Sequence, residues 1–484
     1  MKNTQIVDNT TTEKDRVEKR KSRRSKIGWI FLLLVAVIAI IMLMAASVYS
    51  VSTTGSLFEN YGIRADSAYL IITLLVILPI LLLIIFFVLV LGKNKPQTIS
   101  ADVVIDGGAI NTAGDSKSGN EAKDRDERFC MLSEIDKNKS IYTRTSYDRG
   151  IDLERLCENF RNYAASRLKL YYDIEDIRRF IAGMSVSHIL ILQGMSGTGK
   201  TSLAHAFGSF IDNSSTVIPV QPMWKERTDL VGYYNEFTKR FNETLLLQKM
   251  YEANYSKDIY VTVLDEMNIA RVEYYFAEFL SLLELPNPEE RYLDVVSDKW
   301  TTDPKELKDG RIKLPVNMWF IGTANNDDST FAISDKVYDR AMIINLDSKS
   351  ERFAAPLTGK VHISAEQFEE LVENALKEYE ISQRNRKRLE MLDKYLIEHF
   401  HITFGNRIMK QILTYIPVYI ACGGDELCAL DDILSKKVMR KLETQNPIYL
   451  RNTAEGLISY MDELFGADNM KLCKEQIRRI ERNA

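Results

Sequence analysis

The stretch HILILQGMSGTGKTS, residues 188–202, decides the fold of this chain. Its first six residues form an apolar run typical of a buried β-strand. The next eight, Gly194 to Thr201, match G-x-x-x-x-G-K-[ST], and a helical pattern follows. A strand before and a helix after are the context that a phosphate-binding P-loop requires. The stretch therefore predicts an α/β fold built around a nucleotide site.

Each residue type in this loop suits phosphate binding. Glycines allow positive φ, so successive backbone N–H groups can point at phosphate oxygens. The helix beginning near Lys200 adds its positive dipole end. Lys200 would bind the β- and γ-phosphates, and Thr201 would offer its hydroxyl to Mg²⁺. The predicted nucleotide-binding residues are Gly194, Ser196, Gly197, Thr198, Gly199, Lys200, Thr201 and Ser202.

Two further strands are expected to end beside the P-loop. The run 259–264 leads into Asp265 and Glu266. We expect Asp265, with Thr201, to hold Mg²⁺, and Glu266 to polarise the attacking water. The run 318–323 leads to Asn325, whose amide is placed to reach the γ-phosphate and that water. A turn is an equally good interpretation of the Asn-Asn-Asp-Asp sequence that starts there.

Arg340 precedes a fourth apolar run, 341–346. Two interpretations of this arginine are open. It could stabilise transition-state charge on the nucleotide of a neighbouring subunit. Alternatively, it could form an intrachain salt bridge at a helix end.

Three segments carry a resemblance to a known family: QPMWKERTDLVGYY (221–234), LDEMNIARVEYYFAEFLSLLE (264–284) and GTANNDDSTFAISDKVYDRA (322–341). They resemble AAA+ ATPases of the McrB-like and MoxR-like type, in the dynein-related branch. The resemblance covers the chain from about Gly150 to the C-terminus. It implies a five-stranded parallel P-loop core flanked by helices, 150–350, an all-α lid, 351–484, and assembly into rings, usually hexamers.

The resemblance also implies roles for single residues. Lys200 and Thr201 fall on Walker A, and Asp265 and Glu266 on Walker B. Asn325 falls on sensor 1, Arg340 on a trans-acting arginine finger, and Arg407 on sensor 2 at the start of a lid helix. The predicted catalytic residues are Glu266, Asn325, Arg340 and Arg407.

Two departures from the restriction-type members bear on function. We expect a membrane hairpin at the position where those members carry a modified-DNA-reading domain, and Asn325-Asn326-Asp327-Asp328 differs from the Asn-Thr-Ala-Asp of the restriction GTPases. We therefore expect ATP with Mg²⁺, with GTP as the alternative. The leading hypothesis is a membrane-anchored ATPase that remodels or moves a protein or nucleic-acid partner. The alternatives are the motor of a McrBC-like defence system with a separate nuclease, and a nucleotide-switched membrane scaffold.

The first hundred residues indicate a membrane anchor. Residues 27–48 and 68–91 contain no charged residue, and about 20 apolar residues suffice to span a bilayer as a helix. Basic residues flank the pair on its outer sides, whereas the loop between them holds only Arg64. The positive-inside rule then predicts two transmembrane helices within 27–91, with both ends and the ATPase module in the cytoplasm.

Composition divides the rest of the chain. The tail 1–26 is basic, with nine Lys or Arg and four Asp or Glu, although the whole chain carries −4. The remainder is therefore acidic, which argues against a generally basic nucleic-acid binder. Residues 92–149 are polar and Gly/Ser-rich, as expected of a flexible linker. Trp224, Tyr233 and Tyr234 are expected either to face a ring pore or to pack in the core.

Overall fold

The computed structural model describes residues 127–144, 146–325, 330–347 and 350–483. The predicted membrane hairpin, 27–91, lies outside these residues, as does most of the predicted linker. Across the described part of the chain, no helix is both long and apolar enough to cross a membrane.

A five-stranded parallel sheet forms the centre of the described unit. The strand order is β10-β1-β9-β5-β2. The prediction of a parallel-sheet α/β core is confirmed, and strand β2 is the one that sequence patterning missed. The strands are β1 Ile189–Gln193, β2 Thr216–Pro219, β5 Tyr260–Asp265, β9 Met318–Ala324 and β10 Met342–Asn345.

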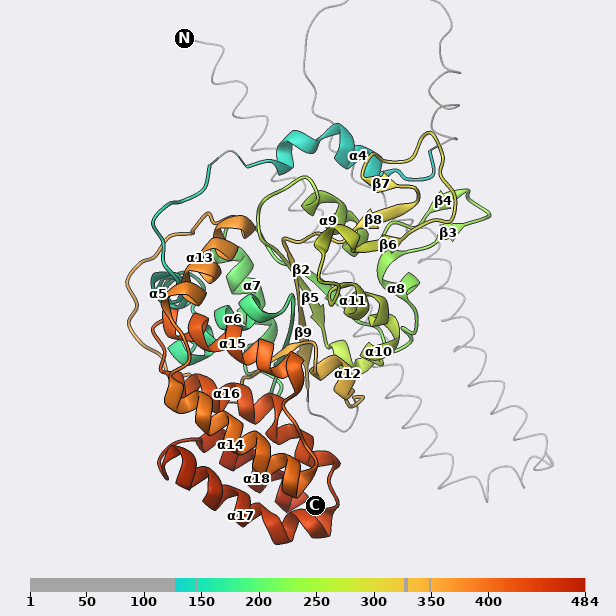
Figure 1. The fold of residues 1–484 in the computed structure, drawn as a ribbon. Helices are drawn as coiled ribbons and strands as arrows, with labels where there is room; N and C mark the ends of the chain where they lie inside the picture. The colour runs from blue at the N-terminus through green and yellow to red at the C-terminus, as the bar shows by residue number, and fades with distance from the viewer. Residues whose placement is uncertain (1–126, 145, 326–329, 348–349, 484) are drawn as a thin grey trace, which may run out of the picture. The chain divides into compact units, whose positions relative to one another are not determined.

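Both faces of the sheet are buried, which explains the unbroken apolar runs. Leu190 and Leu192 of β1 point into one hydrophobic cluster, and Ile189 and Ile191 into another. Helices lie on each side (Figure 1). The first cluster includes α5 (Leu153–Tyr163), α6 (Ile174–Val186) and α7 (Lys200–Phe210); the second includes α4 (Met131–Lys137), α8 (Arg227–Val231), α9 (Leu245–Ala253), α10 (Val272–Tyr275) and α11 (Ala277–Leu282).

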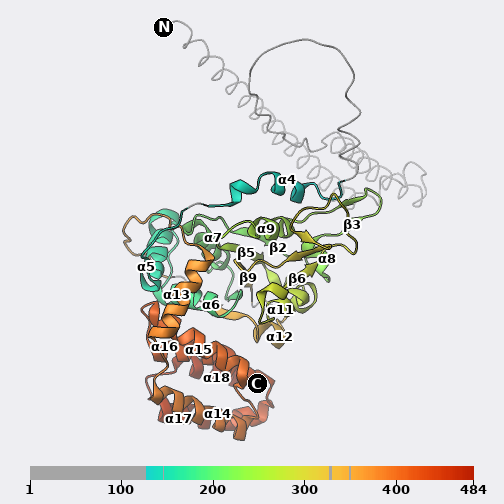
Figure 2. The ribbon, with the colours of Figure 1, turned by 45° about the horizontal axis from the view of Figure 1, so that its top comes forward.

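The chain from Ala365 onward is helical, as predicted for the C-terminal region. Helices α14 and α17 pack together at the end of the unit farthest from α4 (Figures 1 and 2). Helix α15 packs on α6 and so joins this region to the core. The elements are α13 Ala365–Glu378, α14 Gln383–Phe400, α15 Gly405–Ala421, α16 Glu426–Lys437, the 3₁₀ helix η6 Met439–Thr444, α17 Pro447–Phe465 and α18 Lys471–Asn483.

Two small antiparallel sheets interrupt the core. One pairs β3 (Tyr234–Asn235) with β4 (Arg240–Phe241); the other has the order β6-β8-β7, from Tyr292–Asp294, Arg311–Lys313 and Leu307–Lys308. Trp224 packs edge-on against Tyr275, and Tyr234 against Trp300. Those two aromatic residues therefore pack within the chain, whereas Tyr233 is 51% exposed.

The structure differs from the predicted flexible linker at its C-terminal end. Arg128 is buried and pairs with Asp303 through Nη2, at 2.7 Å, and its guanidinium lies 4.6 Å from the ring centre of Trp300. Phe129 stacks on Phe241. Three backbone N–H groups at residues 130–132 donate to the carboxylate of Glu243. These specific contacts order a segment whose polar composition resembles a linker.

A substitution at Gly322 of β9 can test how tightly the sheet packs against the turn that follows β5. A Cβ at Gly322 would lie 1.9 Å from Sδ of the buried Met267, which follows Glu266 in the chain. We expect Gly322→Ala to lower the free energy of unfolding by about 1–3 kcal/mol, because an overpacked core must shift. Urea unfolding measures this. Gly359→Ala is the control, since a Cβ there meets nothing within 4 Å; equal stability of the two variants would contradict the packing.

Candidate nucleotide-binding site

The strand register brings the predicted site residues to one edge of the sheet. Gln193 of β1 is level with Ala324 of β9, and Leu264 of β5 is level with Gly322. The next residues along these strands are the P-loop glycine Gly194, then Asn325 and Asp265. Carboxyl ends of parallel strands are where ligands bind in α/β sheets.

Backbone conformation and close packing both require glycine in the P-loop. Gly194 has φ 144°, and a Cβ there would lie 2.2 Å from the carbonyl oxygen of Leu346. Gly199 has φ 96° and faces Tyr172, whose hydroxyl donates to the Gly199 carbonyl at 3.1 Å. Burial raises the pKa of Tyr172, so the phenol stays protonated. Tyr172 thus fixes the end of the P-loop.

Lys200 begins α7 and folds back over the loop. Its ammonium donates to the carbonyl oxygens of Gly194, at 2.9 Å, and Met195, at 2.8 Å. The side chain is buried. The P-loop and the first turn of α7 supply the other predicted nucleotide ligands. Gly197 has φ 79°, Thr198 donates to the Met195 carbonyl, Ser196 is exposed, and Ser202 lies in the first turn of α7.

A chain of hydrogen bonds joins the P-loop helix to the ends of β5 and β9. The Thr201 hydroxyl donates to Oδ1 of Asp265 at 2.7 Å, and the Thr323 hydroxyl donates to the same oxygen at 2.8 Å. The backbone N–H of Glu266 donates to the Thr323 hydroxyl oxygen at 2.8 Å. The structure therefore brings together Thr201 and Asp265, the predicted Mg²⁺ ligands.

Glu266 has an unusual backbone conformation for a residue with a side chain. Its φ is 53° and its ψ 46°, in the left-handed region. Non-glycine residues pay of order 1 kcal/mol to adopt such conformations, and they cluster at functional sites. The Thr323 hydroxyl holds the Glu266 N–H in place, and the Glu266 side chain is exposed. The carboxylate is thus fixed at its base and accessible at its tip.

Asn325 is held through its backbone. Its carbonyl oxygen accepts hydrogen bonds from Nδ2 of Asn268, at 2.9 Å, and from the Thr330 hydroxyl, at 3.1 Å. Asn268 lies in the turn directly after Glu266, so this buried amide joins the Walker B turn to the segment containing Asn325. Residues 326–329 lie outside the described residues. The role of the Asn325 amide stays a prediction.

Arg340 and Arg407 share one counter-ion. Nη2 of Arg340 lies 2.9 Å from Oε2 of Glu284, and Nη2 of Arg407 lies 2.6 Å from Oε1 of the same carboxylate. The intrachain salt bridge left open for Arg340 is therefore present. Arg407, at the start of α15, lies beside the predicted finger residue, a pairing that no motif indicated.

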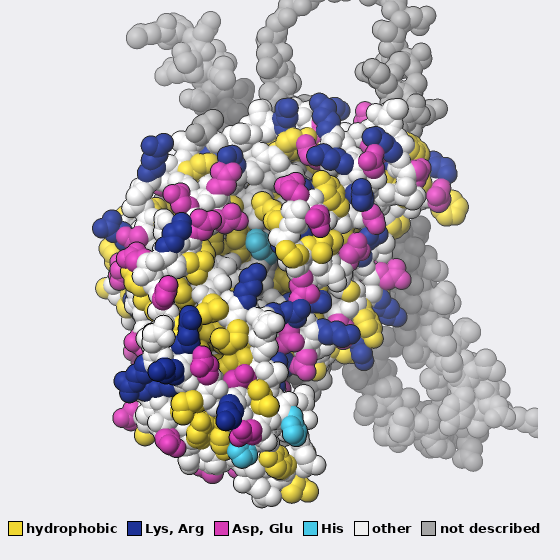
Figure 3. Space-filling model, in the orientation of Figure 1, with side chains coloured by type: hydrophobic (Ala, Val, Ile, Leu, Met, Phe, Trp, Pro, Cys, Tyr) yellow, Lys and Arg dark blue, Asp and Glu magenta, His cyan; other side chains and the backbone are white. Residues whose placement is uncertain are grey.

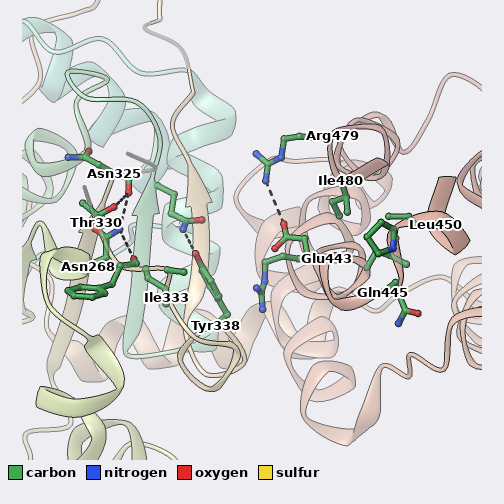
Figure 4. Close-up of a pocket in the computed structure, with 16 residues that line it drawn as sticks. Asn268, Asn325, Thr330, Ile333, Tyr338, Glu443, Gln445, Leu450, Arg479 and Ile480 are labelled. Carbon is green, nitrogen blue, oxygen red and sulfur yellow. Dashed lines mark hydrogen bonds and ion pairs between the residues drawn. The ribbon is translucent and has the colours of Figure 1, made fainter. Parts of the chain in front are cut away.

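A cavity of about 730 Å³ lies between part of the core and part of the C-terminal helices (Figure 4). Gln193, Asn268 and Asn325 line its core side, where the Gln193 side chain hydrogen-bonds the Tyr338 hydroxyl. Arg479 and Glu443 face them from α18 and η6. A second cavity of about 240 Å³ shares Gln193 and Arg479 with it. The cavities therefore adjoin the residue that precedes the P-loop.

The residues present fit a magnesium nucleotide. The P-loop offers backbone N–H groups and the start of an 11-residue helix, and a helix N-terminus attracts phosphate. A hydroxyl and a carboxylate meet at Thr201 and Asp265, and oxygen ligands of this kind suit Mg²⁺.

Comparisons with known proteins agree with this geometry. Residues 189–341 match the AAA domain (dynein-related subfamily), and residues 359–484 match a domain of unknown function (DUF8727). No curated protein matches the chain.

Among solved structures, the chain is similar to a full-length MCM homolog from Methanopyrus kandleri, with 9% identity and a TM-score of 0.30. The match covers 64% of this chain and spans 58% of that chain. The AAA match and the geometry together make residues 189–341 an AAA+ P-loop NTPase domain.

No motif indicated Thr323. Substitutions at this residue test the hydrogen-bond chain described above. Thr323→Val keeps the shape but removes the hydroxyl that contacts Asp265 and Glu266. We expect nucleoside-triphosphate turnover to fall about 10-fold or more, because small displacements of catalytic groups are costly. Thr323→Ser should retain most of the turnover. Steady-state phosphate release from the full-length variants measures both, and equal activity of Thr323→Val and the wild type would contradict this role.

Proposed function

We propose that the chain is a membrane-anchored AAA+ ATPase that binds and hydrolyses Mg²⁺-ATP to remodel or move a partner macromolecule. One observation carries the proposal. A hydrogen-bond chain through Thr323 links Thr201 and Asp265, the expected magnesium ligands, to the backbone of Glu266, whose side chain is exposed. A protein that only binds nucleotide would have no use for that carboxylate.

The residues have separate tasks in this proposal. Lys200 and the P-loop N–H groups bind the phosphates, and Thr201 and Asp265 would hold Mg²⁺. When bound, the metal neutralises phosphate charge. Glu266 orients the attacking water and accepts its proton. Asn325 would orient the same water from the end of β9.

The two arginines support assembly into a ring. A single carboxylate, Glu284, contacts both guanidiniums, so Arg340 and Arg407 can both bind one anionic group. Side-chain exposure is 24% for Arg340 and 52% for Arg407. In an assembled ring, the terminal phosphates of a nucleotide bound to the next copy would be that group. Such arginines stabilise transition-state charge on phosphoryl oxygens.

The proposal includes the McrB-like and MoxR-like branch, an assembly of six copies and a preference for ATP over GTP. Acidic and basic side chains are interspersed on the face shown in Figure 3, and this face offers no uniform field for a polyanion. Activity driven by GTP, together with a separate nuclease, would instead favour the defence-system motor.

Phosphate release from the full-length protein tests the proposal. We expect ATP turnover per protomer to rise with protein concentration, because Arg340 acts only on another copy. Lys200→Ala should lose nucleotide binding, whereas Glu266→Gln should bind ATP but lose turnover. A GTP preference would move the defence-system motor to first place. Tight binding without turnover in the wild type would favour the nucleotide-switched scaffold.

The membrane anchor rests on sequence alone and needs its own test. We expect the full-length protein to sediment with membranes and to resist extraction by alkaline carbonate, because two apolar helices would span the bilayer. Deletion of residues 27–91 should release the protein into the soluble fraction. A full-length protein that carbonate extracts would contradict the anchor and leave the ATPase proposal intact.

A further inference from the structure

The segment that carries Arg340 is held from one side by the C-terminal helices. This Arg340 segment, Asp335–Ala341, comprises the short helix α12 (Asp335–Tyr338) and the turn into β10. Nε2 of Gln411 in α15 donates to the Asp339 carbonyl at 3.1 Å. Arg440 of η6 pairs with Asp335, and its guanidinium lies 4.0 Å from the ring centre of Tyr338.

Lys437, the last residue of α16, makes the most buried of these contacts. Only 3% of the residue is exposed. Its Nζ donates to the carbonyls of Tyr338, at 2.7 Å, Asp339, at 3.4 Å, and Ala341. These carbonyls lie on both sides of Arg340. The last carbonyls of a helix lack intrahelical partners. The Lys437 ammonium, which comes from α16, supplies hydrogen-bond donors to the carbonyls at the end of α12.

Burying a lysine is costly unless its ammonium group has hydrogen-bond partners, and the carbonyls beside Arg340 supply them here. Burial lowers the pKa of Lys437 to about 7, while nearby Asp339 acts in the opposite direction. The adjacent Lys436 is buried as well but pairs with Asp432 of its own helix, at 2.5 Å. Lys437 alone of the two reaches across to the Arg340 segment. Because it is anchored on a 12-residue helix, a displacement of α16 would move that segment too.

We propose that Lys437 is a positioning residue for Arg340, through which the C-terminal helices of one copy set the arginine presented to the next copy's nucleotide. This inference rests on the proposed trans-acting ATPase and goes beyond it. The C-terminal helices would thus control the nucleotide site of the neighbouring copy through Lys437, in addition to any role at their own site.

The first test compares two buried lysines in the full-length protein. Lys437→Met removes the donors and keeps the length of the side chain. We expect kcat for ATP to fall about 10- to 100-fold, the loss associated with a displaced catalytic group, with the KM for ATP unchanged. Lys436→Met, the matched control, should lose stability and keep kcat. An unchanged kcat in Lys437→Met would overturn the inference.

Mixing variants separates positioning of the neighbour's site from a structural defect. Lys437→Met protomers have an intact P-loop, and Lys200→Ala protomers have an intact Arg340 segment. Mixed assemblies should therefore hydrolyse ATP faster than the summed rates of the two variants measured separately. Arg340→Ala mixed with Lys200→Ala should behave in the same way.

The two mixtures also distinguish the possible failures. If only the Arg340→Ala mixture gains activity, the Lys437 inference is wrong and the proposed function stands. If neither mixture gains activity, the trans-acting proposal fails and the inference falls with it. Should Lys437→Met not fold, as judged by thermal unfolding, Gln411→Ala replaces it, since it removes only the Asp339 contact. It should show a smaller loss of kcat and the same gain on mixing.

Discussion

The hydrogen bonds around Oδ1 of Asp265 connect the parts of the site. Thr201 reaches this oxygen from α7, and Thr323 from β9, while Thr323 also binds the N–H of Glu266. The helix that starts the phosphate site and two central strands are thus fixed to one atom. Because those strands are buried on both faces, the site inherits the rigidity of the core, and catalytic groups benefit from being preorganised in this way.

A second constraint joins the core to the C-terminal helices. Arg407, Gln411, Lys437 and Arg440 contact the Arg340 segment or share its counter-ion, Glu284. A cavity of about 730 Å³, lined in part by Tyr338 and Arg440 of this junction, also lies between the two regions. A further polar junction joins α6 to the C-terminal helices, where Arg179 pairs with Asp432 and the Tyr419 hydroxyl donates to Glu175. Because Tyr338 and Arg440 line the cavity, a movement that changes it is expected to act on the Arg340 segment.

Sequence patterns predicted the elements that are specified by residues close together in the chain. Four of the five core strands were expected from apolar runs, and the P-loop from its motif. Contacts between residues that are far apart in the chain produce no motif or apolar run in the sequence. In the sequence, Thr323 resembles an ordinary strand residue, Glu284 an acid at a helix end, and Lys437 a solvated lysine. In the folded chain, Thr323 contacts Asp265, Glu284 contacts Arg340, and Lys437 contacts the Arg340 segment. The ordered segment at Arg128 was missed for the same reason, since its partner Asp303 lies 175 positions away.

The most direct measurement is an experimental structure of the full-length protein, assembled with a non-hydrolysable ATP analogue and Mg²⁺. The account predicts a ring in which Arg340 and Arg407 of one copy contact the terminal phosphate bound to the next, with Lys437 still on the carbonyls beside Arg340. An assembly in which both arginines contact the nucleotide of their own copy, or remain paired with Glu284 away from any phosphate, would contradict it.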